Sequence, residues 1–385
     1  MVAKEIQIVF LLALIKFSLP SRLPMSNVPG ETLIVIAAPS VWDPHYADRF
    51  RELIDFDIDL VQSILSRDNV LLVADTHTLP YFEGKVPDDV LLESNIYDIW
   101  MRDFAPFSAK DKLFQFRYVQ KDQEDLFGEV VEESFNRFIA EHFVDIASSS
   151  ELHLTGCNVI ENGENRALIS EKVFTDNEEM FQDWAIRIQL RNIFGNIVFL
   201  PDLTNSSFCP DNKTMPLENI LAFVDEDTIV MAEVEEPDRS AILDAIKKGF
   251  RGKVKTMEMH VQFVPESWNG HVGVCGIHTA VLVTENYVYM PVFGNDPENW
   301  KMGFSSMMDK HNLQMLQVMT AKEVIPVNVP HKICQMGASP RSLTWELRGP
   351  AADQLINVAR MRANIRRAIR KKLNPAKHVE DQLKS

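Results

Sequence analysis

The four cysteines are the most chemically reactive side chains in this chain of 385 residues. They stand at positions 157, 209, 275 and 334, and they form no C-x-x-C pair and no Cys/His cluster with the spacing of a zinc site. We therefore predict no metal site and no cofactor. Four cysteines in so long a chain do not make a disulfide scaffold. Which of them pair, if any, stays open at the level of sequence.

The charge of the chain limits its partners. Its formal net charge is −16, with an isoelectric point near 5.1. An acidic surface repels phosphate backbones, so nucleic acid is not an expected partner. Acidic side chains in a cleft could attract a small cationic ligand, although plain solubility is the simpler explanation of the charge. Nothing in the sequence identifies a protein partner.

Hydrophobic spacing predicts the elements that must position any site. The apolar run at residues 32–38 and the run at 69–74 read as buried strands, and residues 46–65 carry apolar side chains at helical spacing. Strand, helix and strand in this order predict a parallel pair joined by a crossover. A C-terminal helix is expected over residues 351–373.

A unit of hairpin, helix and strand recurs in the second half of the chain. Two hairpins are predicted at residues 219–232 and 279–293, and a third at 166–176, with turns centred on Glu226, Glu285 and Glu171. Each is followed by a predicted helix and then by a strand. Repeats of this size indicate an array around a centre, with helices outside.

Four segments, in order along the chain, resemble the signatures of the agmatine deiminase family, which includes the bacterial peptidylarginine deiminases. They are DIWMRDFAP at 98–106, TGCNVIENG at 155–163, ENILAFVD at 218–225 and MGASPRSLTW at 336–345. The resemblance implies an α/β pentein fold, an α/β-propeller of five pseudo-symmetric ββαβ units around a central site. That expectation agrees with the repeats.

The resemblance also implies roles for residues in the first and last segments. In the family a thiolate attacks the guanidinium carbon, a histidine moves protons and acidic residues hold the cation. Asp103 matches the first acidic residue that holds the guanidinium, and Trp100 and Arg102 beside it match too. Arg341 matches a position that takes His or Arg. Ser342 stands where the family has its nucleophilic cysteine.

Other family positions are replaced. Thr155 stands where the family has Glu or Asp, Pro216 where it has the histidine, and Glu218 where it has a second aspartate that holds the cation. Proline cannot move a proton, and a serine without a nearby base is a poor nucleophile. His260, His271 and His278 are most simply structural, and Cys209 or Cys334 would be a substitute thiol only if it lay at the centre.

Three functional hypotheses follow. The first, which the concerted losses favour, is a catalytically inactive pseudoenzyme that binds a guanidino-type cation or a partner through Trp100, Arg102, Asp103, Glu218 and Arg341. The second is an active guanidine-modifying hydrolase that uses Ser342 in place of cysteine. The third is a structural interaction protein with a closed centre. A base or thiol next to Ser342 would support the second, and a filled centre the third.

The two ends of the chain are interpreted separately from the domain. Residues 1–30 form a leader whose apolar run at 6–15 resembles a signal peptide but is too short to span a bilayer. Two glycosylation sequons begin at Asn205 and Asn212 and fit a secreted protein. The sequence leaves open whether the protein is secreted or cytoplasmic. The pentein domain is expected over residues 31–358. Residues 359–385 form a basic helix end and tail, read either as a solvated face or as a docking face for an acidic partner.

Overall fold

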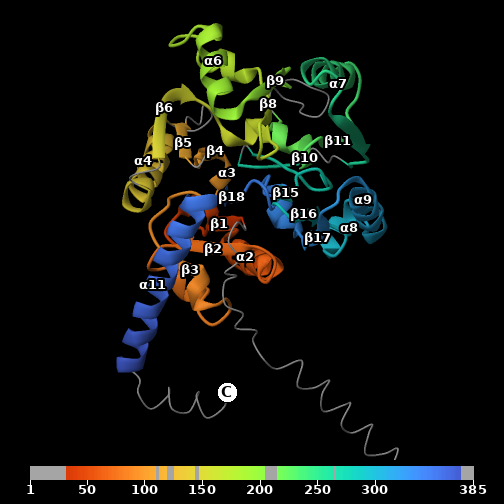
Figure 1. Ribbon diagram of the computed structural model, residues 1–385. Coiled ribbons are helices and arrows are strands. Elements are labelled where there is room, and N and C mark those ends of the chain that lie inside the picture. Colours follow the sequence, from red (N-terminus) through yellow and green to blue (C-terminus); the bar gives the residue numbers. More distant parts are fainter. Residues whose placement is uncertain are drawn as a thin grey trace, which may run out of the picture.

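The protein consists of five similar α/β units that follow one another around a centre, with their helices on the outside (Figure 1). The computed structural model describes residues 32–109, 112–118, 125–143, 147–203, 215–262, 266–269 and 271–373. Each unit has a three-stranded core in which a hairpin is followed by a helix and a parallel strand.

The first unit joins the two ends of the domain. It consists of β18 (Thr344–Leu347), β1 (Leu33–Ala37), α2 (Phe50–Ile64) and β2 (Asn69–Ala74), extended by β3 (Leu91–Glu93). Here β1 pairs antiparallel with β18, with Val35 opposite Trp345, and parallel with β2, with Val35 opposite Leu71. Every residue of β1 and β2 is buried, as the apolar runs predict. The last strand thus completes the unit that the first strand begins.

The other four units are continuous in sequence. The second is β4 (Phe107–Ala109), β5 (Lys112–Arg117), α4 (Asp125–His142) and β6 (Ala147–His153), and the third is β7 (Val159–Glu161), β8 (Arg166–Ser170), α6 (Asp183–Phe194) and β9 (Asn196–Leu200). The fourth is β10 (Leu221–Asp225), β11 (Thr228–Ala232), α7 (Asp238–Gly249) and β12 (Lys255–Met259), and the fifth is β15 (Leu282–Val283), β16 (Tyr287–Val292), α9 (Ser306–Met319) and β17 (Glu323–Asn328).

Short elements connect these units and carry parts of three of the signature segments. They are η1 (Pro44–Tyr46), η2 (Leu79–Tyr81), η3 (Asp88–Val90), α3 (Met101–Phe104), η4 (Gly156–Asn158), α5 (Lys172–Thr175), η5 (Leu217–Asn219), β13 (Ser267–Trp268), β14 (His271–Val272), α8 (Pro297–Lys301) and α10 (His331–Gln335). A disulfide between Cys275 and Cys334 ties the segment before β15 to α10. The sequence left this pairing open.

The hairpin predicted at residues 166–176 is wrong. After Ser170 the chain enters α5 instead of a second strand, and β8 pairs antiparallel with the preceding strand β7. The turn lies at Asn162, whose side-chain oxygen accepts hydrogen bonds from three following backbone N–H groups, while Gly163 takes a positive φ of 77°. The similar spacing of Glu171, Glu226 and Glu285 therefore does not reflect equivalent turns.

The C-terminal helix α11 (Gly349–Leu373) runs across the domain boundary predicted at residue 358 and packs on η3 and β3. Arg366 donates to the backbone oxygens of Asp88 and Leu91, and Arg370 pairs with Glu83 and Asp88. Two basic residues at the end of α11, Arg366 and Arg370, therefore bind to the domain itself. Cys209, both sequons and the leader lie outside the described residues. None of the helices in the described ranges is long and apolar enough to cross a membrane.

Candidate functional site

The four signature segments meet at the centre of the ring. Helix α3 carries Asp103 and contacts both η4 and β18, and η4 in turn contacts η5, which carries Glu218. Figure 1 shows α3 and β18 between the surrounding units. A Cβ atom on Gly156 would lie 1.8 Å from the backbone oxygen of Arg102, so only glycine permits this approach of η4 to α3.

The two carboxylates at the centre are bound by side chains of the chain itself. The Asp103 carboxylate accepts hydrogen bonds from the backbone N–H and the thiol of Cys157. Glu218 is 2% exposed, and its Oε2 lies 3.6 Å from Nε of the buried Arg341. Both carboxylates therefore have internal partners, and one of these partners is a guanidinium.

Burial sets the protonation of these groups. It raises the pKa of Asp103 to about 6, with the Cys157 hydrogen bonds acting in the opposite direction. It raises the pKa of Glu218 to about 7, and the charge of Arg341 opposes that rise. Burial and then the two carboxylates raise the pKa of the Cys157 thiol well above its ordinary value. This thiol is therefore a hydrogen-bond donor and not a thiolate nucleophile.

A second ion pair lies beside the first. Arg102 pairs with Glu346 of β18, and both side chains are largely buried. Burial opposes the charged form of Glu346, but Arg102 and Arg341 outweigh it and lower the pKa of this carboxyl. Glu161 lies in the field of the same cations. The centre thus contains buried charges of both signs, which the acidic net charge of the whole chain did not suggest.

Ser342 is built into a turn. Its Oγ accepts a hydrogen bond from the backbone N–H of Ser339 at 2.8 Å and lies 3.1 Å from the Ser339 carbonyl oxygen, to which it donates. The backbone oxygen of Ser342 also accepts from the Arg102 N–H. The residue is 4% exposed. Its hydroxyl therefore closes the turn that leads into β18.

The histidines considered in the sequence have other partners. His278 directs its two ring nitrogens to the Gly276 carbonyl and to Asp309, and His260 is exposed and pairs with Glu233. His271 stacks on Trp100 with the ring centres 5.1 Å apart. Pro216 and Thr155 start η5 and η4, respectively. Cys334 is in the disulfide.

A small pocket opens beside this centre. Its volume is about 40 Å³, enough for two or three water molecules. The charged residues that line it are Arg102, Arg341, Arg348 and Lys322 on the basic side, and Glu161, Asp225 and Glu346 on the acidic side. Asp103, Glu218 and Ser342 do not line it. A pocket with more basic than acidic groups does not attract a guanidinium.

Sequence reasoning missed the partners that fill the centre. Cys157 stands within the signature segment at 155–163, which was the available signal. Glu161 belongs to that segment, but the resemblance assigned it no role, and Glu346 follows the segment at 336–345. Their contribution is visible only from their positions in the field of Arg102 and Arg341.

The ring of five ββαβ units with the four segments at its centre defines an α/β pentein, the fold of guanidine-modifying enzymes. Residues 30–347 match the family model of the Porphyromonas-type peptidyl-arginine deiminases, and the chain belongs to this family. No curated protein matches the chain in sequence.

Solved structures agree with the fold. A putative peptidyl-arginine deiminase is 16% identical, with a TM-score of 0.66, and the match covers 85% of this chain and 97% of that one. The agmatine deiminase of C. jejuni is 16% identical, with a TM-score of 0.64, covering 83% and 94% of the two chains. A cysteine-to-serine variant of that enzyme, solved with substrate bound, is 17% identical, with a TM-score of 0.63 over 84% and 96%. At these identities the likeness shows the fold alone.

Proposed function

We propose that this chain is a non-catalytic member of its family, a pseudoenzyme whose centre is closed by its own side chains. The observation that carries the proposal is the Arg341–Glu218 pair, a buried guanidinium on a buried carboxylate at the meeting point of the signature segments. Arg341 takes the part that a substrate guanidinium would otherwise play.

The surroundings support the same reading. The Cys157 thiol and N–H occupy the Asp103 carboxylate, and the Ser342 hydroxyl is held by Ser339. Pro216 cannot carry a proton at the position where the family has histidine. Removing single members of a catalytic set already abolishes most of the rate, so this combination leaves no route to hydrolysis. The protein then acts through its surface, as a binding or structural protein.

A serine by itself does not exclude substrate binding, since the C. jejuni variant with a cysteine-to-serine change was solved with substrate. Binding at the centre is therefore tested separately from turnover. Agmatine, arginine and methylguanidinium at millimolar concentration should leave the thermal midpoint of the unmodified protein unchanged, because the Arg341 guanidinium already lies beside Glu218 and the Cys157 hydrogen bonds hold Asp103.

Replacing Arg341 with alanine should open the position that its guanidinium fills. Methylguanidinium should then raise the thermal midpoint of Arg341→Ala, as any ligand that binds only the folded state does. Methylammonium is the matched control ligand, because it has the same charge but lacks the planar arrangement of N–H donors. It should raise the thermal midpoint less than methylguanidinium does. Arg367→Ala, a change on the exposed side of α11, is the control variant and should show no rescue. Stabilisation of the unmodified protein by agmatine would contradict the closed centre.

A further inference from the structure

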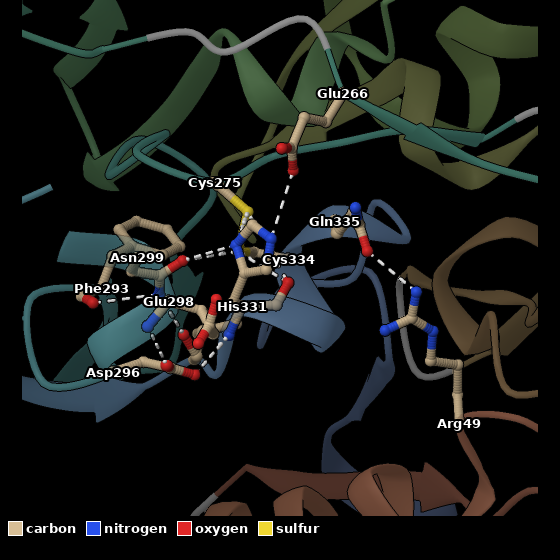
Figure 2. A network of polar contacts seen from close by, with 11 residues as sticks. Arg49, Glu266, Cys275, Phe293, Asp296, Glu298, Asn299, His331, Cys334 and Gln335 are labelled. Carbon is tan, nitrogen blue, oxygen red and sulfur yellow. Dashed lines mark hydrogen bonds and ion pairs between the residues drawn. A yellow bond between two sulfur atoms is a disulfide. The ribbon is translucent and has the colours of Figure 1, made fainter. Parts of the chain in front are cut away.

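The environment of the disulfide supports a second site, unrelated to the centre of the ring. Figure 2 shows His331 beside Cys275 and Cys334, with Glu266, Asn299 and Asp296 around it. One ligand atom from each of Cys275, His331 and Cys334 can be chosen so that all three lie within 4.8 Å of one another. His331 and Cys334 share α10, while Cys275 comes from the segment before β15.

We propose that these three residues form a zinc site whenever the disulfide is reduced. Two thiolates and one imidazole are a donor set that zinc prefers. In a tetrahedral zinc site a sulfur and a nitrogen ligand lie about 3.6 Å apart. His331 Nδ1 lies 3.9 Å from Cys275 Sγ, so this pair already has close to the required separation.

The outer contacts orient the ring for this role. His331 Nε2 lies 3.4 Å from a Glu266 carboxylate oxygen, which leaves Nδ1 to face the sulfurs. A carboxylate on the second ring nitrogen is the usual partner of a metal-binding histidine. The Asn299 side-chain oxygen lies 2.9 Å from Nδ1 and 3.7 Å from Cys334 Sγ. The fourth ligand position falls to this oxygen or to water.

Charge and access fit a cation. Cys275 and Cys334 are buried, and two thiolates there would have the acidic groups of Glu266 and Asp296 nearby. A dication would neutralise this negative charge in a place where water cannot. The His331 and Glu266 side chains are 15% and 24% exposed, so the metal can reach the site from their side.

The chemistry balances in two steps. A dithiol reductant transfers two electrons and two protons to the disulfide, which gives two cysteine thiols and the cyclic disulfide of the reductant. Zinc then binds both sulfurs and displaces their two protons to solvent. In an oxidising compartment the bond stays closed, and the site cannot form.

The experiment uses the full chain, reduced anaerobically with a phosphine so that no added thiol competes for metal. Zinc is added, excess is removed, and bound zinc is measured by elemental mass spectrometry. We expect one zinc per reduced chain and less than roughly a tenth of that in the oxidised chain. Cobalt in place of zinc should give a thiolate-to-metal charge-transfer band. The proposal is overturned if the reduced chain retains no zinc. It is also overturned if the cobalt-substituted chain shows no thiolate-to-metal band.

Variants assign the ligands. Cys275→Ser and His331→Ala should each weaken zinc binding by more than about 100-fold, and Glu266→Gln by roughly 10- to 100-fold. The matched controls are Cys157→Ser, which removes a buried thiol of the described residues outside the disulfide, and Glu233→Gln, which alters another His–Glu pair. Both controls should bind zinc like the unmodified chain, and a loss in either of them contradicts the assignment. If a ligand variant does not fold, the comparison of reduced and oxidised wild-type protein still decides the matter.

Discussion

Replacing Arg341 with methionine should make the stability of the protein strongly dependent on pH. The change keeps most of the side-chain volume but removes the charge that lies 3.6 Å from Glu218. Without Arg341, the buried carboxylate must either stay charged without its partner or take up a proton. Breaking a buried ion pair in this way costs about 3–5 kcal/mol.

The pH at which this cost appears follows from the pKa of Glu218. Its folded value, about 7, lies above the ordinary value of 4.5, so the folded state holds this proton more tightly than the unfolded state. The stability contributed by that proton is complete below the unfolded pKa and is lost as the pH rises through about 7. In Arg341→Met the pKa of Glu218 in the folded state rises further. The stability of the variant therefore continues to fall up to a higher pH than that of the wild type.

The magnitude can be worked out from this shift. Each pH unit over which only the folded state holds the proton changes stability by about 1.4 kcal/mol. The two units between pH 7 and pH 9 therefore give a difference of about 3 kcal/mol between variant and wild type, in agreement with the lower bound for a broken buried pair. Unfolding entropy scales with chain length to roughly 0.8 kcal/mol per degree for this protein, so the thermal midpoint should differ by about 4 °C.

The assay is thermal unfolding of both proteins at pH 6 and at pH 9. We expect a small difference at pH 6, where Glu218 is largely protonated in both, and the full difference at pH 9. The double variant Arg341→Met, Glu218→Gln should regain most of the loss at pH 9, because no charge is then left without a partner. A difference that is the same at both pH values would refute the reasoning.

Further predictions test other parts of the structure. Cys157 should react with a maleimide on the order of 100-fold more slowly in the native protein than in urea, since its thiol is buried and its pKa is raised; equal rates would contradict this. Ser342→Ala should lower stability by about 1–2 kcal/mol through the lost turn hydrogen bonds, and an unchanged thermal midpoint would count against that role. Arg366→Ala should destabilise the protein more than Arg367→Ala, because only Arg366 donates to the body at Asp88 and Leu91; equal effects would mean that α11 does not dock there. Reduction without metal should lower stability by up to about 4 kcal/mol, because the disulfide joins residues 59 apart, and zinc should restore part of it.

The fold was predictable because its signals are local. The predicted strand at 69–74 matches β2, since β-branched apolar runs bounded by polar residues have few other solutions. Only part of the first unit was predictable from periodicity, because its first strand, β18, is the last strand of the chain. The hairpin at Glu171 failed because a polar triplet after a strand is equally compatible with the start of a helix.

The sequence predicted which segments meet, but not the side-chain contacts between them. The signature segments identified Asp103, Glu218, Arg341 and Ser342, and these segments converge as expected. The directions of side chains do not follow from the spacing of residues in the sequence. The sequence therefore did not predict that Arg341 pairs with Glu218 or that Cys157 pairs with Asp103. The grouping of Cys275, His331 and Cys334 was missed for the same reason. Its sequence signal is the H-x-x-C spacing on α10, which is too short to identify a site by itself.

The most direct test of the central claim is an assay for ammonia and for the deiminated product with agmatine, free arginine and peptidyl-arginine. We predict no release by the purified protein, and none by Ser342→Cys, because the proton carrier is still missing at Pro216 and Arg341 still fills the centre. Turnover by the unmodified protein that disappears in Ser342→Ala would contradict the account and identify an enzyme with a serine nucleophile.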